Sequence, residues 1–238
     1  MSIGNQINKT EGISVITATN RDNCMKLIFD NYVRQQWSSK ELIIILNSDL
    51  MNLTKWKMEA KKYKQVTVYQ LPENMTLGKC LNYGVENAKY EYIAKFDDDD
   101  YYSPKYLDES VDTMNKMNAD VVGKRTCFMY LTNKKELRIR FPGKENCEVN
   151  ILQGATIFTT KKLLKLLPFP NKNLGECLHF LQRCKKKGYK ICASSRYNYT
   201  ILRKEAKYHT WRPTKEYLDI TSERIAYTED YTQYVDET

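Results

Sequence analysis

Between residues 13 and 119, short apolar runs alternate with longer segments whose apolar residues recur every three or four positions. The short runs predict buried strands, and the longer segments predict amphipathic helices. We expect strands at 13–17, 42–46, 66–71 and 91–96, and helices at 23–36, 53–64, 77–88 and from 103 onward, the last with Ser103 as N-cap and Pro104 at its first position. This alternation predicts an α/β fold with a mostly parallel sheet between helices. Such sheets bind ligands beyond the carboxyl ends of their strands.

The second half of the chain has a more mixed pattern. We expect strands at 120–131, 137–141, 154–160 and 190–193, and helices at 161–167 and 174–187. Residues 1–12 are predicted to be a flexible lead-in and residues 213–238 an acidic helix or arm. The prediction is therefore one domain at 13–212, with a ligand-binding half at 13–119 and a second half at 120–212.

Composition and charge narrow the class of protein. No apolar run approaches the roughly 18–20 residues of a membrane-spanning helix, and no signal-peptide core is recognisable, so we expect a cytoplasmic protein without an integral membrane segment. The seven cysteines form no CxxC pair, which argues against a disulfide framework or a zinc ribbon. The net charge is +9, yet residues 213–238 hold seven acidic and two basic residues, so the body of the chain is strongly basic. A basic body suits an anionic partner, such as nucleotide phosphates, a phosphorylated acceptor or nucleic acid, and also a plain lysine-rich surface.

Four consecutive aspartates, Asp97 to Asp100, directly follow the strand expected at 91–96. Their charges repel one another unless a cation neutralises them, and Mg²⁺ or Mn²⁺ takes oxygen ligands that it shares with substrate phosphates. In extended backbone, Asp97 and Asp99 point to one side and the other two to the opposite side. One pair can therefore face a ligand while the other holds the following turn. The alternative is a solvated acidic loop ahead of a helix.

The segment YIAKFDDDDYYSP at 92–104 resembles the DxD region of family 2 glycosyltransferases of the GT-A fold. Other segments resemble that family in the same order: SVITATNR at 14–21, ELIIILN at 41–47 with Gln35 before it, GKCLNYGV at 78–85, GA at 154–155 and GE at 175–176. The resemblance covers about residues 12–212. Within the family, the chain resembles the spore-maturation type of endospore-forming bacteria, which adds spore association as an expectation. The shared elements are TNR at 19–21, LN at 46–47, LNYG at 81–84, FDDDDYY at 96–102 and HTW at 209–211.

The resemblance implies a nucleotide-sugar donor site in the half at 13–119. Its donor-binding residues would be Thr17, Thr19, Asn20, Asn47, Lys79, Asn82, Asp97 and Asp98, and its Mn²⁺ or Mg²⁺ ligands would be Asp97, Asp99 and His209. Many relatives have an Asp that reads the uracil ring where this chain has Asn47. An amide both donates and accepts hydrogen bonds, so the base of the donor stays open.

The resemblance also implies an inverting transfer in which a carboxylate removes the proton of the acceptor hydroxyl. In relatives this carboxylate is the Asp of a Glu-Asp pair at the start of a helix. This chain has Glu176 and Cys177 at that position. Glu176 is therefore the candidate base, although a Glu in a first helical turn is also favoured by the helix dipole alone. Cys177 at a helix start is expected to have a lowered pKa and to be a candidate thiolate.

Three other functions are weighed against a working transferase. A catalytically impaired module that binds a nucleotide sugar or glycan fits the replacement at Cys177. A nucleotidyltransferase would carry a glycine-rich phosphate loop after the first strand, which TATNR at 17–21 lacks. A nucleic-acid-binding protein fits the basic body but shows no recognisable motif, so we expect no nucleic-acid partner. The acceptor, a glycan, protein or small molecule, and the oligomeric state are left open by the sequence.

Overall fold

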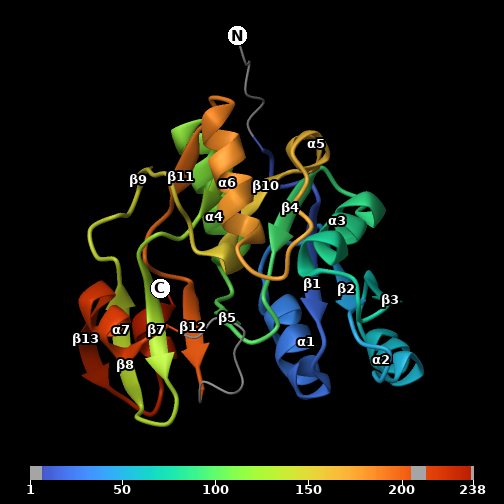
Figure 1. The fold of residues 1–238 in the computed structure, drawn as a ribbon, viewed down its shortest axis with the longest axis horizontal. Helices are drawn as coiled ribbons and strands as arrows, with labels where there is room; N and C mark the ends of the chain where they lie inside the picture. Colours follow the sequence, from blue (N-terminus) through green and yellow to red (C-terminus); the bar gives the residue numbers. More distant parts are fainter. Residues whose placement is uncertain (1–6, 205–212, 237–238) are drawn as a thin grey trace.

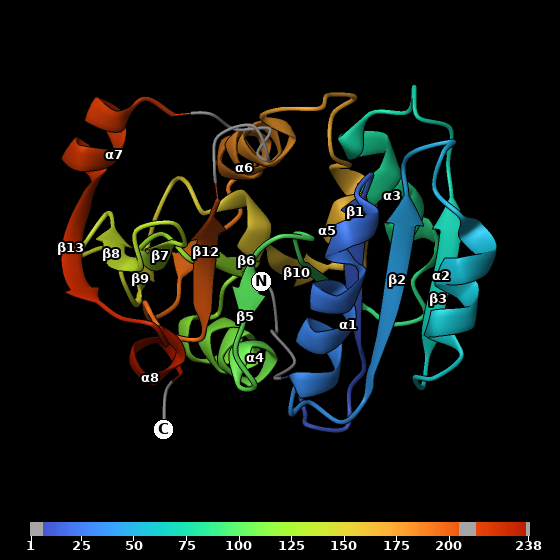
Figure 2. The same ribbon diagram turned by 90° about the horizontal axis from the view of Figure 1, so that it is seen from below.

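The computed structural model describes residues 7–204 and 213–236, which form two sheets and the helices around them (Figure 1). The larger sheet has the order β3-β2-β1-β4-β10-β6-β11-β9, and the smaller has the order β13-β8-β7-β12-β5. Figures 1 and 2 show β13 and β8 of the smaller sheet at the opposite end of the molecule from β3 and α2.

The strands of the larger sheet are β1 (Ile13–Thr19), β2 (Lys40–Leu46), β3 (Val66–Gln70), β4 (Tyr92–Lys95), β6 (Val121–Gly123), β9 (Cys147–Glu148), β10 (Phe158–Thr160) and β11 (Ile191–Ala193). Those of the smaller are β5 (Tyr101–Tyr102), β7 (Cys127–Leu131), β8 (Glu136–Arg140), β12 (Tyr199–Arg203) and β13 (Ser222–Tyr227). The helices are α1 (Met25–Arg34), α2 (Leu53–Ala60), α3 (Leu77–Asn87), α4 (Tyr106–Met117), α5 (Lys161–Leu166), α6 (Glu176–Lys186), α7 (Lys215–Thr221) and α8 (Thr232–Val235), with 3₁₀ turns η1 (Asp22–Cys24) and η2 (Gly154–Thr156).

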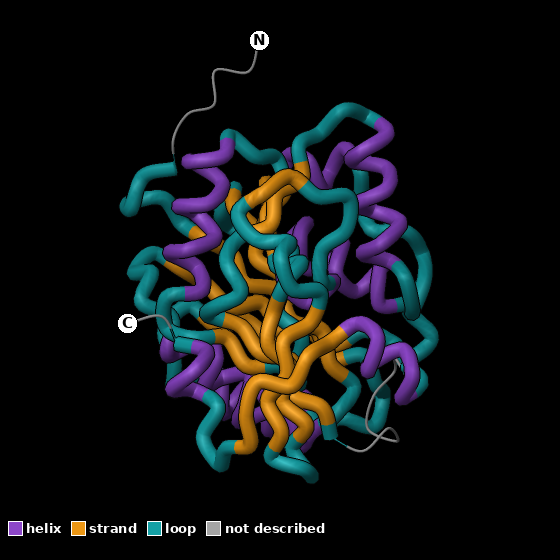
Figure 3. The backbone as a smooth tube through the Cα atoms, turned by 90° about the vertical axis from the view of Figure 1, so that its left-hand side faces the viewer, coloured by secondary structure: helices purple, strands orange, loops and turns teal. Residues whose placement is uncertain are grey.

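Helices cover both faces of the larger sheet, and Figure 3 shows its strands between two groups of helices. Apolar residues of α1, α2 and α4 pack with Val15 and Leu42 on one face. Those of α3, α5 and α6 pack with Ile16 and Ile43 on the other. Neighbouring strand residues point to opposite faces, so one apolar strand contributes to both layers.

The sheet is parallel on one side and mixed on the other. β1 pairs in parallel with β2 and β4, and β2 pairs in parallel with β3. β10 is antiparallel to both β4 and β6. This arrangement confirms the predicted α/β fold with a mostly parallel first half and a mixed second half.

Several element predictions were wrong in detail. α4 begins at Tyr106 with Lys105 before it, because the Ser103 hydroxyl donates to Asp236 and is not used as an N-cap. The strand expected at 120–131 is split into β6 and β7, because the chain leaves the larger sheet after Gly123 and joins the smaller one. Residues 154–156 of the strand expected at 154–160 form the turn η2.

The C-terminal segment adds an edge strand to the smaller sheet. β13 pairs antiparallel with β8, and α8 places Val235 in the core with no exposed surface. The side chain of Asp236 then accepts hydrogen bonds from Tyr101 and Ser103, just beyond the acidic run. The division of the chain into a lead-in, two halves and an arm stays a prediction. Among the described helices, none has the length and apolar character to cross a membrane.

Candidate active site

The acidic run lies at the carboxyl end of β4, beside the end of β1. Register pairs Ile16 of β1 with Lys95 of β4, so β1 runs three residues further, to Thr19. The run turns back toward this extension, and the Thr19 hydroxyl donates a 2.5 Å hydrogen bond to Asp98 Oδ2. Thr19 and Asp98, both predicted site residues, are therefore in direct contact although 79 positions separate them.

The four aspartates alternate between buried and more exposed. Asp98 and Asp100 are each 5% exposed. The side chains of Asp97 and Asp99 are 39% and 17% exposed. The expected alternation is present, but the expected extended backbone is not, because β4 ends at Lys95 and the run forms a turn at Asp98 and Asp99 and a bend at Asp100. Asp97 and Asp99 are therefore the two whose oxygens a ligand reaches more easily.

Arg21 is a site residue that the sequence analysis did not single out. Its guanidinium pairs with both carboxylate oxygens of Asp98, through Nε at 3.1 Å and through Nη2, and Nη2 lies 3.1 Å from Asp99 Oδ2. Burial raises the pKa of Asp98, and the hydrogen bond from Arg21 works in the opposite direction. The sequence signal was a lone basic residue directly after the polar end of the first strand.

Asp100 holds the smaller sheet against the acidic run. Its Oδ2 accepts a 2.5 Å hydrogen bond from the Tyr199 hydroxyl, and its Oδ1 accepts one from the backbone N–H of Leu202 at 3.2 Å, both from β12. Burial, more than the neighbouring aspartates, raises the pKa of Asp100 well above its ordinary value. Asp100 thus has a structural role, because both of its oxygens hold β12 against the acidic run.

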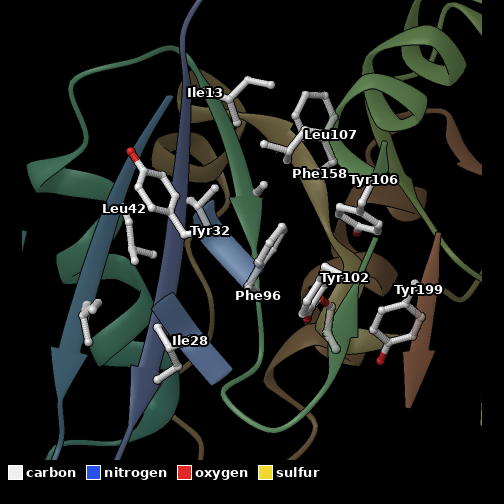
Figure 4. Close-up of a cluster of buried hydrophobic side chains, with 14 of the residues drawn as sticks. Ile13, Ile28, Tyr32, Leu42, Phe96, Tyr102, Tyr106, Leu107, Phe158 and Tyr199 are labelled. Carbon is white, nitrogen blue, oxygen red and sulfur yellow. Dashed lines mark hydrogen bonds between the residues drawn. The ribbon is translucent and has the colours of Figure 1, made fainter. Parts of the chain in front are cut away.

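Aromatic rings support the run from inside the core. Phe96 and Tyr102 stack with ring centroids 3.7 Å apart, and Tyr106 meets Phe96 edge-on. Figure 4 shows these rings beside Tyr199. The Tyr102 hydroxyl accepts a 2.7 Å hydrogen bond from the backbone N–H of Asp97. The cluster therefore fixes the backbone on both sides of the aspartates.

Lys95 is a second site residue that the sequence analysis missed. It is 4% exposed, and its ammonium forms an ion pair with Asp97 Oδ1. Its signal in the sequence was a charge inside an otherwise apolar strand, one residue before the aromatic that precedes the aspartates. Three of the four aspartates are therefore paired with basic side chains: Asp98 and Asp99 with Arg21, and Asp97 with Lys95.

The start of α6 faces the same end of β4. Gly175, with φ +79°, lets the chain turn into the helix, and Glu176 and Cys177 are 7% and 5% exposed. Cys177 Sγ lies 3.1 Å from Glu176 Oε1 and donates to Gly154 O at 3.4 Å. Burial raises the pKa of Cys177 well above its ordinary value, so the expected thiolate is wrong: without water to solvate it, the sulfur stays a thiol.

The other predicted donor residues lie around the strand ends. Thr17 is buried in β1, and Asn20 is exposed just after it. Asn47 follows β2, where its backbone N–H donates to Thr19 O at 2.8 Å and its side-chain amide donates to Pro72 O at 2.8 Å. These residues therefore share one edge of the sheet with the acidic run.

Lys79 and Asn82 lie on α3. Lys79 is exposed. The amide of Asn82 makes two hydrogen bonds with the backbone of Phe169, at 2.8 and 2.9 Å, which anchor the segment between α5 and α6. Among the described residues, no hydrogen bond or ion pair joins either side chain to the aspartates.

The described residues offer two carboxylates to a cation, Asp97 and Asp99, and no cluster of three or more His, Cys, Asp or Glu side chains arranged to hold a metal ion. His209 lies outside the described residues. Two carboxylates fit a cation that takes its remaining ligands from water and substrate phosphates. They do not form a complete protein cage.

The mixed sheet, the acidic run at the end of β4 and the helix start that faces it define a GT-A-type glycosyltransferase fold. The chain belongs to the glycosyl transferase family 2, whose family profile matches residues 14–183. The predicted family is therefore confirmed.

Curated relatives agree with this assignment. An uncharacterized glycosyltransferase of Rickettsia typhi is 29% identical over 109 residues, which is 45% of this chain and 33% of that protein. The O-antigen biosynthesis glycosyltransferase WbnJ of Escherichia coli is 35% identical over 117 residues, which is 47% of this chain and 44% of that protein. The chain thus matches less than half the length of these relatives.

Solved structures share the fold at low identity. S. aureus TarS 1–349 in complex with UDP-GlcNAc has a TM-score of 0.61 and 17% identity, covering 82% of this chain and 59% of that one. The mannosyltransferase PcManGT of Pyrobaculum calidifontis in complex with GDP-Man and Mn²⁺ has a TM-score of 0.64 and 14% identity, covering 86% and 61%. The likeness establishes the GT-A fold.

Proposed function

We propose that the protein is an inverting glycosyltransferase that moves a sugar from a nucleotide-diphosphate donor to a hydroxyl acceptor. One observation carries the proposal: the acidic run, the end of β1 and, through η2, the start of α6 come together at the carboxyl end of β4. Membership of the glycosyl transferase family 2 supports it. The complexes of TarS with UDP-GlcNAc and of PcManGT with GDP-Man support a nucleotide-sugar donor.

The proposed donor site lies along the ends of β1, β2 and β4. Its residues are Thr17, Thr19, Asn20, Asn47, Lys79, Asn82, Asp97 and Asp98. Asp97 and Asp99, with His209, are the proposed ligands of Mn²⁺ or Mg²⁺, and the Mn²⁺ in the PcManGT complex supports cation use. A bound divalent cation neutralises the charge of the leaving nucleoside diphosphate. Arg21, next to Asp98 and Asp99, adds a positive charge on the same side.

The proposed base is Glu176. In an inverting transfer the acceptor oxygen bonds to the anomeric carbon as the bond from that carbon to the diphosphate breaks. The proton of the acceptor hydroxyl passes to the Glu176 carboxylate. Glu176 lies in the first turn of α6, at the positive end of the helix dipole.

A second candidate function is a nucleotide-sugar or glycan-binding module with impaired turnover. The observation that favours it is the buried Cys177, a neutral thiol where relatives supply a carboxylate. The two candidates share donor binding and differ in donor consumption. Release of free nucleoside diphosphate from a bound nucleotide sugar supports the transferase, and tight binding without release supports the module.

Thermal unfolding tests the donor site. We expect one of UDP, GDP, CDP, ADP and dTDP to raise the melting temperature with Mn²⁺ present and less without it. As a control, Asp30→Ala should be stabilised by the nucleotide and Mn²⁺ as much as the wild-type protein is, because Asp30 forms an exposed ion pair with Lys26 away from the acidic run. If none of the five nucleotides stabilises the protein in a metal-dependent way, the donor site is wrong.

The acceptor and the cellular setting are extensions of this proposal. The acceptor is a glycan, a protein or a small molecule with a free hydroxyl. The motif resemblance at 92–104 supports the spore-maturation type and with it a cytoplasmic or spore-associated enzyme. Absence of the protein from sporulating cells and purified spores would remove that subgroup and leave the donor site unaffected.

A further inference from the structure

Two arginines share one aromatic ring near the start of η2. The guanidinium carbon of Arg125 lies 3.6 Å from the centroid of the Phe141 ring, and that of Arg140 lies 4.9 Å from the same centroid. Arg125 follows β6, where the chain passes from the larger sheet to the smaller one, and Arg140 is the last residue of β8. Guanidinium groups stack on aromatic faces and present planar forks of N–H donors. The fold therefore brings two positive charges to one ring.

The backbone of Phe141 has an unusual conformation that other segments hold in place. Its φ is +47°, in the left-handed region that bulky residues rarely adopt. Its carbonyl accepts a 2.6 Å hydrogen bond from the Thr126 hydroxyl, and its N–H donates to Thr221 O at 2.9 Å. Strained backbone persists where the surrounding structure holds it, and it is frequent at ligand-binding sites. The position of this ring is thus a feature that the fold maintains at a cost.

Arg125 differs from two other partly buried arginines of the second half of the chain. Arg138 pairs with Glu136 at 2.8 Å, and Arg196 pairs with Glu145 at 2.6 Å. Arg125 is also partly buried, but no carboxylate within residues 7–204 and 213–236 forms an ion pair with it. Burial is the largest influence on the pKa of Arg125 and lowers it. A guanidinium that has lost part of its hydration without gaining a carboxylate is suited to bind an external anion.

A short series of contacts joins this pair of arginines to the start of α6. Arg140 Nη1 lies 3.5 Å from Gln153 Oε1. The next residue, Gly154, accepts the Cys177 thiol at 3.4 Å, and a Cβ on Gly154 would lie 3.2 Å from Cys177 Cβ. Cys177 Sγ in turn lies 3.1 Å from Glu176 Oε1. The arginines therefore lie on the side of the proposed base.

We propose that Arg125 binds an oxyanion carried by the acceptor, a phosphate or a carboxylate, and that Arg140 and Phe141 hold it in position. The assignment of the anion to the acceptor rests on the proposed function, but the binding of an anion does not. The planar fork of a guanidinium matches two oxygens of either group. Arg140, only 2% exposed, adds a second positive charge from behind. The acceptor is therefore an acidic hydroxyl compound, and neutral compounds are poorer acceptors.

Titration with inorganic phosphate tests the anion site without a donor, a metal ion or turnover. With a chelator present, we expect saturable binding to the wild-type protein and at least about tenfold weaker binding to Arg125→Gln. Arg196→Gln is the matched control and should bind as the wild type does, because it removes the same charge from an arginine that has a carboxylate partner. Calorimetry gives the three affinities. Equal affinities in the two variants, or no saturable binding to the wild type, would overturn the proposal.

A variant that keeps every charge separates a built site from general attraction to a basic protein. Phe141→Leu removes the ring beside both guanidiniums, and we expect it to weaken phosphate binding about threefold or more. General attraction depends on net charge alone, so an unchanged affinity in Phe141→Leu would contradict the site as described. Should Arg125→Gln not fold, Arg125→Lys replaces it. This variant keeps the charge without the fork and should also bind phosphate more weakly.

Matched acceptors test whether the anion belongs to the acceptor. Glucose, glucose phosphate and glucuronate share a ring with free hydroxyls and differ in a phosphate or a carboxylate. With Mn²⁺ and the nucleotide sugar that the protein binds, we expect one acidic compound to accelerate release of nucleoside diphosphate at least about tenfold more than glucose does. Arg125→Gln should lose this preference, and Arg196→Gln should keep it. The preferred compound identifies the oxyanion, and a wild-type protein without any preference would overturn the assignment to the acceptor.

These measurements separate the anion site from the proposed function. If the wild-type protein binds phosphate through Arg125 but shows no metal-dependent nucleotide binding, the proposed function fails and the anion site stands. If nucleotide binding is present and Arg125→Gln binds phosphate as the wild type does, the anion site fails alone. If Arg125→Gln weakens nucleotide binding with Mn²⁺ as much as phosphate binding, the arginines serve the donor diphosphate and the assignment to the acceptor is wrong.

Discussion

The proposed donor side and the proposed acceptor side of this site are built in different ways. The donor side comes from consecutive strands and helices, and three of its aspartates have basic partners, Arg21 and Lys95. The acceptor side comes from α6 and η2, and its carboxylate Glu176 has a neutral thiol beside it. If the proposed function is right, donor binding and turnover rest on separate parts of the chain, so one can be intact while the other is impaired.

The largest expected effect is on the donor side. Asp99→Ala should weaken binding of a nucleoside diphosphate with Mn²⁺ by about 100-fold, because it removes one of two carboxylate ligands. Glu176→Ala should leave the binding intact. Calorimetric titration of both variants measures the contrast. Equal losses in the two variants would show that donor and acceptor sides do not separate as described.

The second-largest effect is expected at the contact between β12 and the acidic run. Tyr199→Phe removes the hydroxyl that donates to the buried Asp100, and we expect a loss of about 2 kcal/mol in unfolding free energy. Tyr197→Phe is the control, because Tyr197 is 37% exposed. Urea unfolding gives both values. A loss no larger than that of the control would mean that the Tyr199 hydroxyl does not stabilise the contact between Asp100 and β12.

A smaller effect is expected at the acceptor side. Cys177→Asp restores the pair of acidic residues at the start of α6 beside Lys95, and we expect about a tenfold rise in donor turnover. Cys177→Ser keeps the size without the carboxylate and should give no gain. Rates of nucleoside diphosphate release measure the effect. If neither variant is faster, the thiol is not what limits turnover.

The smallest effect concerns the C-terminal segment. Asp236→Ala loses the hydrogen bonds from Tyr101 and Ser103, and we expect about 1 kcal/mol of destabilisation. Glu229→Ala breaks only an exposed ion pair with Lys135 and should change stability little. Thermal unfolding compares the two. If Asp236→Ala lowers the unfolding free energy by several times the expected value, the C-terminal segment also helps to hold the acidic run in place. If it lowers it no more than Glu229→Ala does, the hydrogen bonds of Asp236 do not stabilise the fold.

The first half was predicted more fully than the second for a physical reason. From residue 13 to residue 117, the spacing of the apolar residues distinguishes strands from helices, and this spacing can be read within each short segment. The short strands β5, β9 and β12 and the edge strand β13 carry weaker patterns and were not predicted. The split at Gly123 was also missed, because a change of sheet depends on strands far away in the chain.

The sequence by itself determined the α/β class and the acidic run at the end of an apolar strand, because these follow from periods of two and about 3.6 residues. Only the tertiary structure decided which groups neutralise the aspartates. Arg21 reaches Asp98 across 77 positions, and Tyr199 binds Asp100 from the other half of the chain. Such partners are set by the order of strands in the sheet, which no local pattern contains. The acidic run marked the place of the site, and the fold supplied its counter-charges.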